Sequence, residues 1–152
     1  MFTGDRSGDF LYRALHATGF ATQAESSHAG DGLELRDAYI TASCHCAPPD
    51  NKPYPEEIAA CRGYLTRELT LLRHVQVVVA LGKIAHDNYL AVLKDRGAIA
   101  TRSSFAFGHD IVHALHPILI DSYHPSQQNT STGKLTLRML IEVFENARTR
   151  FR

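Results

Sequence analysis

The residues best suited to chemistry lie in residues 122–126, which read Ser-Tyr-His-Pro-Ser, and at the nearby Asn129. A neutral imidazole at His124 can stabilise a developing anion through its N–H group, and the ring of Pro125 fixes the direction of the loop. Simpler roles remain open for these residues. His124 could cap backbone groups at a strand end, and Ser126 and Asn129 are residue types that favour turns through local backbone bonds.

Three cysteines form the second group of reactive residues. An odd number favours free thiols or metal ligands over a disulfide framework. Cys46 and Cys61 are candidate metal ligands, with fourteen residues between them. Cys61 also lies on the apolar face of a predicted helix, so a buried core thiol is an alternative. A zinc site that includes Cys44 and His45 is disfavoured, because neighbouring residues of a strand point to opposite sides.

An alternation of helices and strands must position these residues. The helices are predicted from apolar residues at helical spacing, with Ser7 as a cap of the first and Pro55 at the first position of another. The strands are short apolar runs. The predicted elements are a helix over residues 7–18, a strand over 38–42, a helix over 55–72, a strand over 75–81, a helix over 82–93, a hairpin or edge strand within 105–115, a strand over 118–120, a polar loop over 126–133 and a final helix with inner residues from Leu135 to Ala147.

This order predicts an α/β fold with three layers, α/β/α, around a short central and mostly parallel sheet. In such sheets the loops that leave the carboxyl ends of the strands build the site. The loops after Ala42 and after Ile120 both lie there, and they hold the cysteines and His124 respectively.

Composition places the chain among ordinary folded proteins. It has 152 residues, of which 44% are hydrophobic, enough for one domain over residues 1–152. The longest apolar run, residues 75–82, is too short to cross a bilayer, and the N-terminus does not resemble a signal peptide. We therefore expect a cytoplasmic protein without a membrane partner. Sixteen basic residues balance sixteen acidic ones, which argues against broad coating of nucleic acid but not against a narrow DNA groove.

Three segments together resemble a known family. Residues 2–11 resemble the segment that follows the first catalytic motif of family 5 uracil-DNA glycosylases. Residues 46–61 resemble the iron–sulfur loop of families 4 and 5, and residues 122–136 resemble the family 5 version of the second catalytic motif. The chain is similar to this family over essentially its whole length, and the three signals follow one another in the family order.

The resemblance implies an enzyme that hydrolyses the N-glycosidic bond of uracil in DNA, with other deaminated bases as further substrates. It implies uracil-containing DNA as the partner, and we expect a monomer. Family members continue upstream of the position of Met1, with the first core strand, a glycine-rich motif and two cysteines. We therefore expect a truncated domain that lacks the first strand. It would keep two of the four ligands of a 4Fe–4S cluster, Cys46 and Cys61.

The resemblance also assigns roles to single residues. His124 would donate to the departing uracil, and the carboxylate of Asp5 would stabilise the sugar cation near C1′. Asn129 and Ser126 would position the phosphate or the base, and Asn51 resembles a family position near the uracil pocket. Thr132 and Gly133 would open the last helix, whose N–H groups could hold a phosphate.

Plainer roles compete with most of these assignments. Asp5 could be a solvated residue in a glycine-flanked turn, Asn51 could serve an ordinary turn, and Thr132 could be an N-cap only. Two alternatives to an active glycosylase also remain. The chain could be a truncated domain without catalysis, or a simple metal-binding or DNA-binding module.

Overall fold

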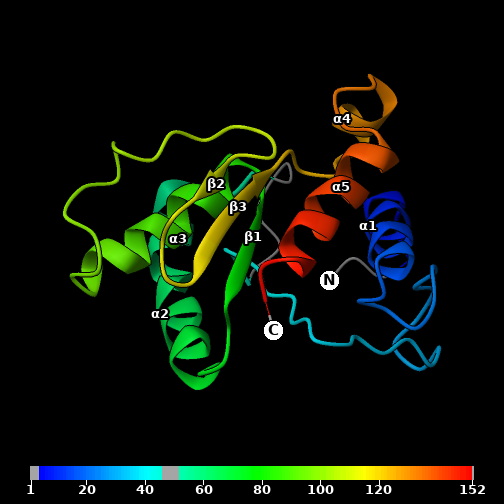
Figure 1. The fold of residues 1–152 in the computed structure, drawn as a ribbon, viewed down its shortest axis with the longest axis horizontal. Coiled ribbons are helices and arrows are strands. Elements are labelled where there is room, and N and C mark those ends of the chain that lie inside the picture. The colour runs from blue at the N-terminus through cyan, green and yellow to red at the C-terminus, as the bar shows by residue number, and fades with distance from the viewer. Residues whose placement is uncertain (1–3, 46–51, 152) are drawn as a thin grey trace.

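The structure is a computed structural model that describes residues 4–45 and 52–151 (Figure 1). Within these residues the sheet has three strands in the order β1-β3-β2, with β1 at Val77–Leu81, β2 at Val112–His113 and β3 at Ile118–Ser122. β1 and β3 are parallel, whereas β2 pairs antiparallel with β3. The α/β class expected from the sequence is confirmed, and the small sheet is mixed.

Helices cover both faces of this sheet (Figure 1). On one face α3 (Lys83–Asp95) contacts β1 and carries α2 (Pro55–Leu71) on its outer side. On the other face α5 (Leu137–Arg148) contacts β3 and packs against α1 (Arg6–Ala17). The short α4 (Gln127–Ser131) lies between β3 and α5 in the chain. The expected three layers are therefore present.

The central strand β3 explains why both layers hold together. Leu119 and Ile120 are fully buried, and successive residues of a strand point to opposite faces. Leu119 joins the cluster that includes Leu90 of α3, while Ile120 joins Val143 of α5. A further cluster fills the space between α1 and α5. No helix in the described residues is long and apolar enough to cross a membrane.

The start of α2 agrees with the sequence prediction, whereas the predicted cap of α1 does not. α2 begins at Pro55, as predicted, and the Glu57 carboxylate accepts a hydrogen bond from the Tyr54 N–H at 2.7 Å. The predicted cap of α1 at Ser7 is wrong. Asp5 is the N-cap residue, and its Oδ1 accepts from the Gly8 N–H at 2.5 Å, because a carboxylate satisfies the free N–H groups of a first turn well.

Three predicted elements differ from the structure. Residues 38–42 form no strand; the apolar side chains of Ala38 and Ile40 pack against the α1–α5 cluster without a pairing partner. Only Val112–His113 of the segment 105–115 pairs in the sheet. The loop after Pro125 contains α4, so Thr132 is the C-cap of α4, whereas Thr136 caps α5.

Candidate functional site

The candidate site lies where the parallel strands β1 and β3 end together. Leu81 pairs with Ser122, and the Gly82 N–H donates to the Ser122 carbonyl oxygen at 2.7 Å. Gly82 has φ +97°, a conformation that residues with a side chain rarely adopt, and a Cβ there would lie 3.1 Å from Cβ of His124. Glycine at this position therefore allows the two strand ends to approach closely.

The turn after His124 is held by its own side chains. The Asn129 side-chain Nδ2 donates to the His124 carbonyl oxygen at 2.9 Å. Ser126 caps α4, and its Oγ accepts from the Asn129 N–H at 3.2 Å. Pro125 is fully buried. These contacts give Ser126 and Asn129 the turn-forming role that the sequence offered as the simpler alternative.

The ionisation of His124 follows from its surroundings. Burial lowers the pKa of His124 below its ordinary value, because the charged imidazolium is poorly solvated there. The carboxylate of Asp5 acts in the opposite direction and raises that pKa. Asp5, at the start of α1, therefore lies close enough to His124 to act on it electrostatically. The net result is an imidazole that stays neutral to a lower pH than a free histidine.

The preceding residue, Tyr123, is held from three sides. Its backbone N–H donates to Nδ1 of His109 at 3.2 Å, and the His109 ring is stacked on the tyrosine ring with centroids 4.9 Å apart. The ammonium of Lys134 lies 4.7 Å from the centroid of the Tyr123 ring. The candidate site thus draws on residues from four separate stretches of the chain.

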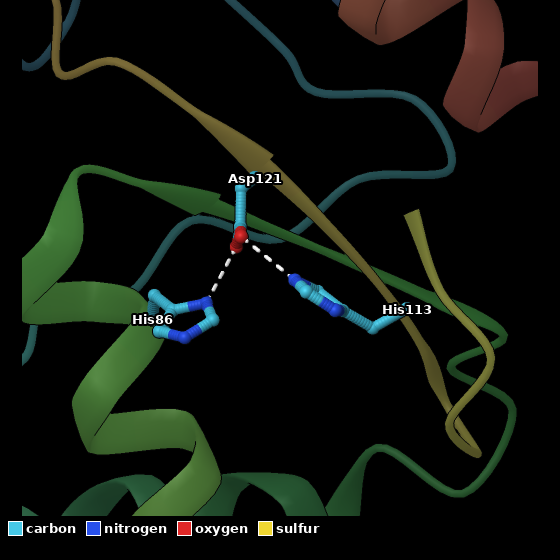
Figure 2. Close-up of side chains that lie close together, drawn as sticks. All are labelled: His86, His113 and Asp121. Atoms are coloured by element: carbon cyan, nitrogen blue, oxygen red, sulfur yellow. Dashed lines mark hydrogen bonds and ion pairs between the residues drawn. The ribbon is translucent and has the colours of Figure 1, made fainter. Parts of the chain in front are cut away.

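A second group of polar residues, His86, His113 and Asp121, lies inside the protein (Figure 2). Asp121 of β3 is fully buried, and its two oxygens contact His86 Nδ1 and His113 Nε2, each at 2.8 Å. His86 Nε2 also lies 3.0 Å from the Phe105 carbonyl oxygen. The Phe105 carbonyl oxygen can only accept, so His86 Nε2 is the donor of that contact.

These three side chains are of types that bind metals, and their ligand atoms lie within 4.8 Å of one another, close enough to hold an ion. Hydrogen bonds between His86, His113 and Asp121 already use these atoms. The Gly108 N–H adds a longer contact of 3.4 Å to Asp121. Through these contacts the group joins α3, β2 and β3.

Comparison with known proteins gives this geometry a family. The model of the uracil DNA glycosylase superfamily matches residues 1–148. The chain belongs to this superfamily. It is 45% identical to a type-5 uracil-DNA glycosylase of Thermus thermophilus, in a match that covers 97% of this chain and 65% of that protein. Similar matches are the type-5 uracil-DNA glycosylases of Mycobacterium bovis, at 44% identity, and Pyrobaculum aerophilum, at 42%.

This chain spans 55% of the length of the M. bovis relative and 62% of the length of the P. aerophilum relative. In each case the match covers 97% of this chain. The family recognised from the sequence is thus confirmed.

Of the remaining predicted site residues of this glycosylase-superfamily chain, two lie outside the described residues and two are exposed on the surface. Asn51 and Cys46 lie outside the described residues. Thr132 is exposed and donates through Oγ1 to the Gln128 carbonyl oxygen at 2.7 Å. Gly133 is exposed with φ +74°. The expectation that these two residues open the last helix is wrong, since that helix begins at Leu137.

The cysteines do not complete an iron–sulfur site by themselves. Such a cluster is normally held by four thiolates, whereas the whole sequence has three cysteines. Cys61 is a free cysteine with 8% exposure on the inner side of α2, and Cys44 is half-buried. The residues present therefore do not fit a closed 4Fe–4S site. The buried position of Cys61 is also what a simple core thiol would have.

Sequence reasoning missed His86, His109 and His113. Their spacing matches no helix, strand or metal motif, and each meets its partner only through the tertiary fold. The one usable signal was a carboxylate directly after the apolar run of residues 118–120. Asp121 follows Ile120 directly in β3, and a carboxylate at such a place requires buried partners.

Proposed function

We propose that this chain carries the part of a uracil-DNA glycosylase site that stabilises the departing uracil. Such a site hydrolyses the N-glycosidic bond of uracil in DNA. The observation that carries this proposal is the half-buried imidazole of His124 at the carboxyl edge of the sheet, where burial lowers its pKa, in a chain of the uracil DNA glycosylase superfamily. Type-5 uracil-DNA glycosylase is also the name of its 42–45% identical relatives.

The proposed chemistry begins with extrusion of the nucleotide from the base stack, at a cost of about a few kcal/mol. The bond between C1′ and the base then breaks, and the electron pair leaves with uracil. A neutral imidazole donates an N–H hydrogen bond to the anionic base and keeps its proton. The neutral imidazole is also the form that burial favours for His124. Water adds to the sugar cation and loses a proton to solvent.

Asp5 is proposed to stabilise the sugar cation by its negative charge. Its carboxylate already accepts the Gly8 N–H, which holds it at the start of α1. Because Asp5 also raises the pKa of His124, the two side chains influence each other across the site. A carboxylate in this place favours a positive charge on the sugar and repels the anionic base after the bond has broken.

The other assignments are proposals of the same kind. Asn51 would contact the base, while Ser126 and Asn129 would act through the turn that they hold. Thr132 and Gly133 are proposed to contact a DNA phosphate from the exposed turn between α4 and α5. Cys46 and Cys61 are proposed as two thiolate ligands of an iron–sulfur cluster, whose other ligands this sequence does not supply; iron and sulfide analysis of the purified protein tests this.

The test is uracil release from a uracil-containing duplex by the parent, His124→Ala and His74→Ala. His74 is an exposed histidine outside the site and controls for the loss of one imidazole. We expect the parent and His74→Ala to leave alkali-labile sites, and His124→Ala to lose most of this activity. Equal cleavage by His124→Ala would overturn the assignment of His124. Binding to the duplex without cleavage by the parent would favour a domain that contacts DNA but does not turn over.

A further inference from the structure

The backbone on either side of His124 is hydrogen-bonded at successive positions. The Ser122 carbonyl oxygen accepts from the Gly82 N–H, and the His124 carbonyl oxygen accepts from the Asn129 side chain. Between them, the Tyr123 N–H donates to Nδ1 of His109. Two of these anchors are a backbone N–H and an amide, which keep their character at any ordinary pH. The third anchor is an imidazole.

The contact with His109 has a required protonation state. A nitrogen that accepts a hydrogen bond carries no proton, so the His109 ring must be neutral with its hydrogen on Nε2. The ring also lies nearly parallel to the Tyr123 ring, at 25°. The same imidazole therefore orients both the backbone and the side chain of the residue that precedes His124.

We propose that His109 is a positioning residue for His124, which holds the Tyr123 peptide only while the His109 ring is neutral. The inference rests on the proposed function in one respect, since a role in catalysis requires that His124 serve the reaction. The contact itself, and its dependence on the proton, do not rest on that function.

The surroundings of His109 support this role. Burial lowers the pKa of His109, while the neighbouring carboxylates of Asp110 and of Glu142 in α5 raise it. Burial is the larger cause, so the neutral form extends below the ordinary range. Lys134 lies over the Tyr123 ring, with its ammonium 4.7 Å from the ring centroid. Asp110 is in turn held by the Asn146 side chain of α5 at 3.1 Å.

Two substitutions at the same position separate the possible roles. His109→Asn places a carbonyl oxygen near the position of Nδ1, so it keeps an acceptor that does not titrate. His109→Leu keeps comparable bulk and removes the acceptor. His74→Leu, at an exposed histidine, is the matched control.

The first measurement does not depend on activity. In the parent we expect the amide resonance of Tyr123 to titrate with His109 at a pH below 6.5, and to be unaffected by acid over that range in His109→Asn. In His109→Leu we expect Tyr123 amide exchange at least about tenfold faster and a displaced ring resonance of His124. Parent-like exchange and an unmoved His124 resonance in His109→Leu would overturn the proposal.

The second measurement uses uracil release. We expect kcat of His109→Leu to fall about tenfold with KM unchanged, since the site loses alignment and keeps its DNA contacts. His109→Asn should stay within about twofold of the parent and lose the acid limb of the pH profile that His109 causes. If the parent releases no uracil, the proposed function fails and the amide measurement still decides the contact. If the parent releases uracil and His109→Leu does so equally well, the positioning role is wrong.

Discussion

Two histidine sites, one within β3 and one just after its end, are built differently. At Asp121 the side chain is fully buried, and both carboxylate oxygens are bound by His86 and His113 (Figure 2). Three residues later, at His124, the Asn129 side chain binds the backbone carbonyl oxygen of the histidine, and the imidazole is only half-buried. The first arrangement uses up its polar groups for stability, whereas the second holds the chain so that a side chain can act.

The largest expected effect is the loss of stability when Asp121 is replaced. Asp121→Ala leaves His86 and His113 buried without their acceptor, and we expect the free energy of unfolding to fall by about 3–5 kcal/mol. Urea denaturation followed by circular dichroism measures this. Asp121→Asn keeps one acceptor oxygen and should cost less. A loss below about 1 kcal/mol for Asp121→Ala would show that the buried group contributes little.

Replacement of His124 should show the reverse pattern. For His124→Ala we expect uracil release to fall by about 10²–10³-fold, the usual cost of removing one donor to a developing anion. The free energy of unfolding should change by less than about 1 kcal/mol, because the Asn129 side chain binds the backbone carbonyl oxygen of residue 124, which the substitution keeps. Single-turnover kinetics and urea denaturation of the same preparation give both values. A large loss of stability with unchanged kinetics would reverse the comparison.

A side chain at Gly82 should disturb His124 more than it disturbs the core. Gly82→Ala forces a residue into φ +97° and brings its Cβ to 3.1 Å from the His124 Cβ. We expect a stability loss of about 1–3 kcal/mol and a shifted ring resonance of His124. Gly97→Ala is the control, because Gly97 also has a positive φ but has nothing within 4 Å of an added Cβ. An unchanged His124 resonance in Gly82→Ala would show that this contact is relieved elsewhere.

The smallest expected effect concerns the charge of Asp5. The pKa of His124 is lowered by burial and partly restored by Asp5, so Asp5→Asn should lower it further. Asparagine also caps helices well, so α1 should remain. The pKa of His124 in the folded protein lies below its unfolded value of about 6.5. The contribution of neutral His124 to the free energy of unfolding is therefore fully present above that unfolded pKa, and it is lost as pH falls through the folded pKa. The His124 ring resonances, followed against pH, should titrate later on acidification in Asp5→Asn. A titration midpoint that moves upward would contradict the proposed effect of Asp5.

Motifs that are continuous in the chain could be predicted from the sequence. The start of α2 at Pro55 depends on its fixed φ and on the carboxylates that follow, all within one turn. The apolar runs of β1 and β3 indicated buried strands, and the position of His124 after β3 indicated a side chain at the carboxyl edge of the sheet. Each of these predictions uses neighbouring residues, whose mutual geometry the local backbone sets.

Residues 38–42 show where such prediction stops. Their apolar pattern suits a strand, but a strand also needs a partner with free backbone groups, and the structure packs their side chains against the α1–α5 cluster instead. The amphipathic helices and the order of elements were enough for the α/β class. They were not enough for the pairing of this segment, because hydrogen-bond partners in a sheet come from distant parts of the chain.

The sequence by itself determined that a histidine, a proline, a serine and an asparagine follow a buried strand in the uracil DNA glycosylase superfamily. Only the tertiary structure decided that Gly82 touches His124, that His109 accepts the Tyr123 N–H, and that His86 and His113 meet on Asp121. The physical reason is that the pairing of β1 with β3 and β3 with β2 brings together residues between 8 and 42 positions apart, such as His113 with Asp121 and Gly82 with His124. No spacing along the chain encodes those distances.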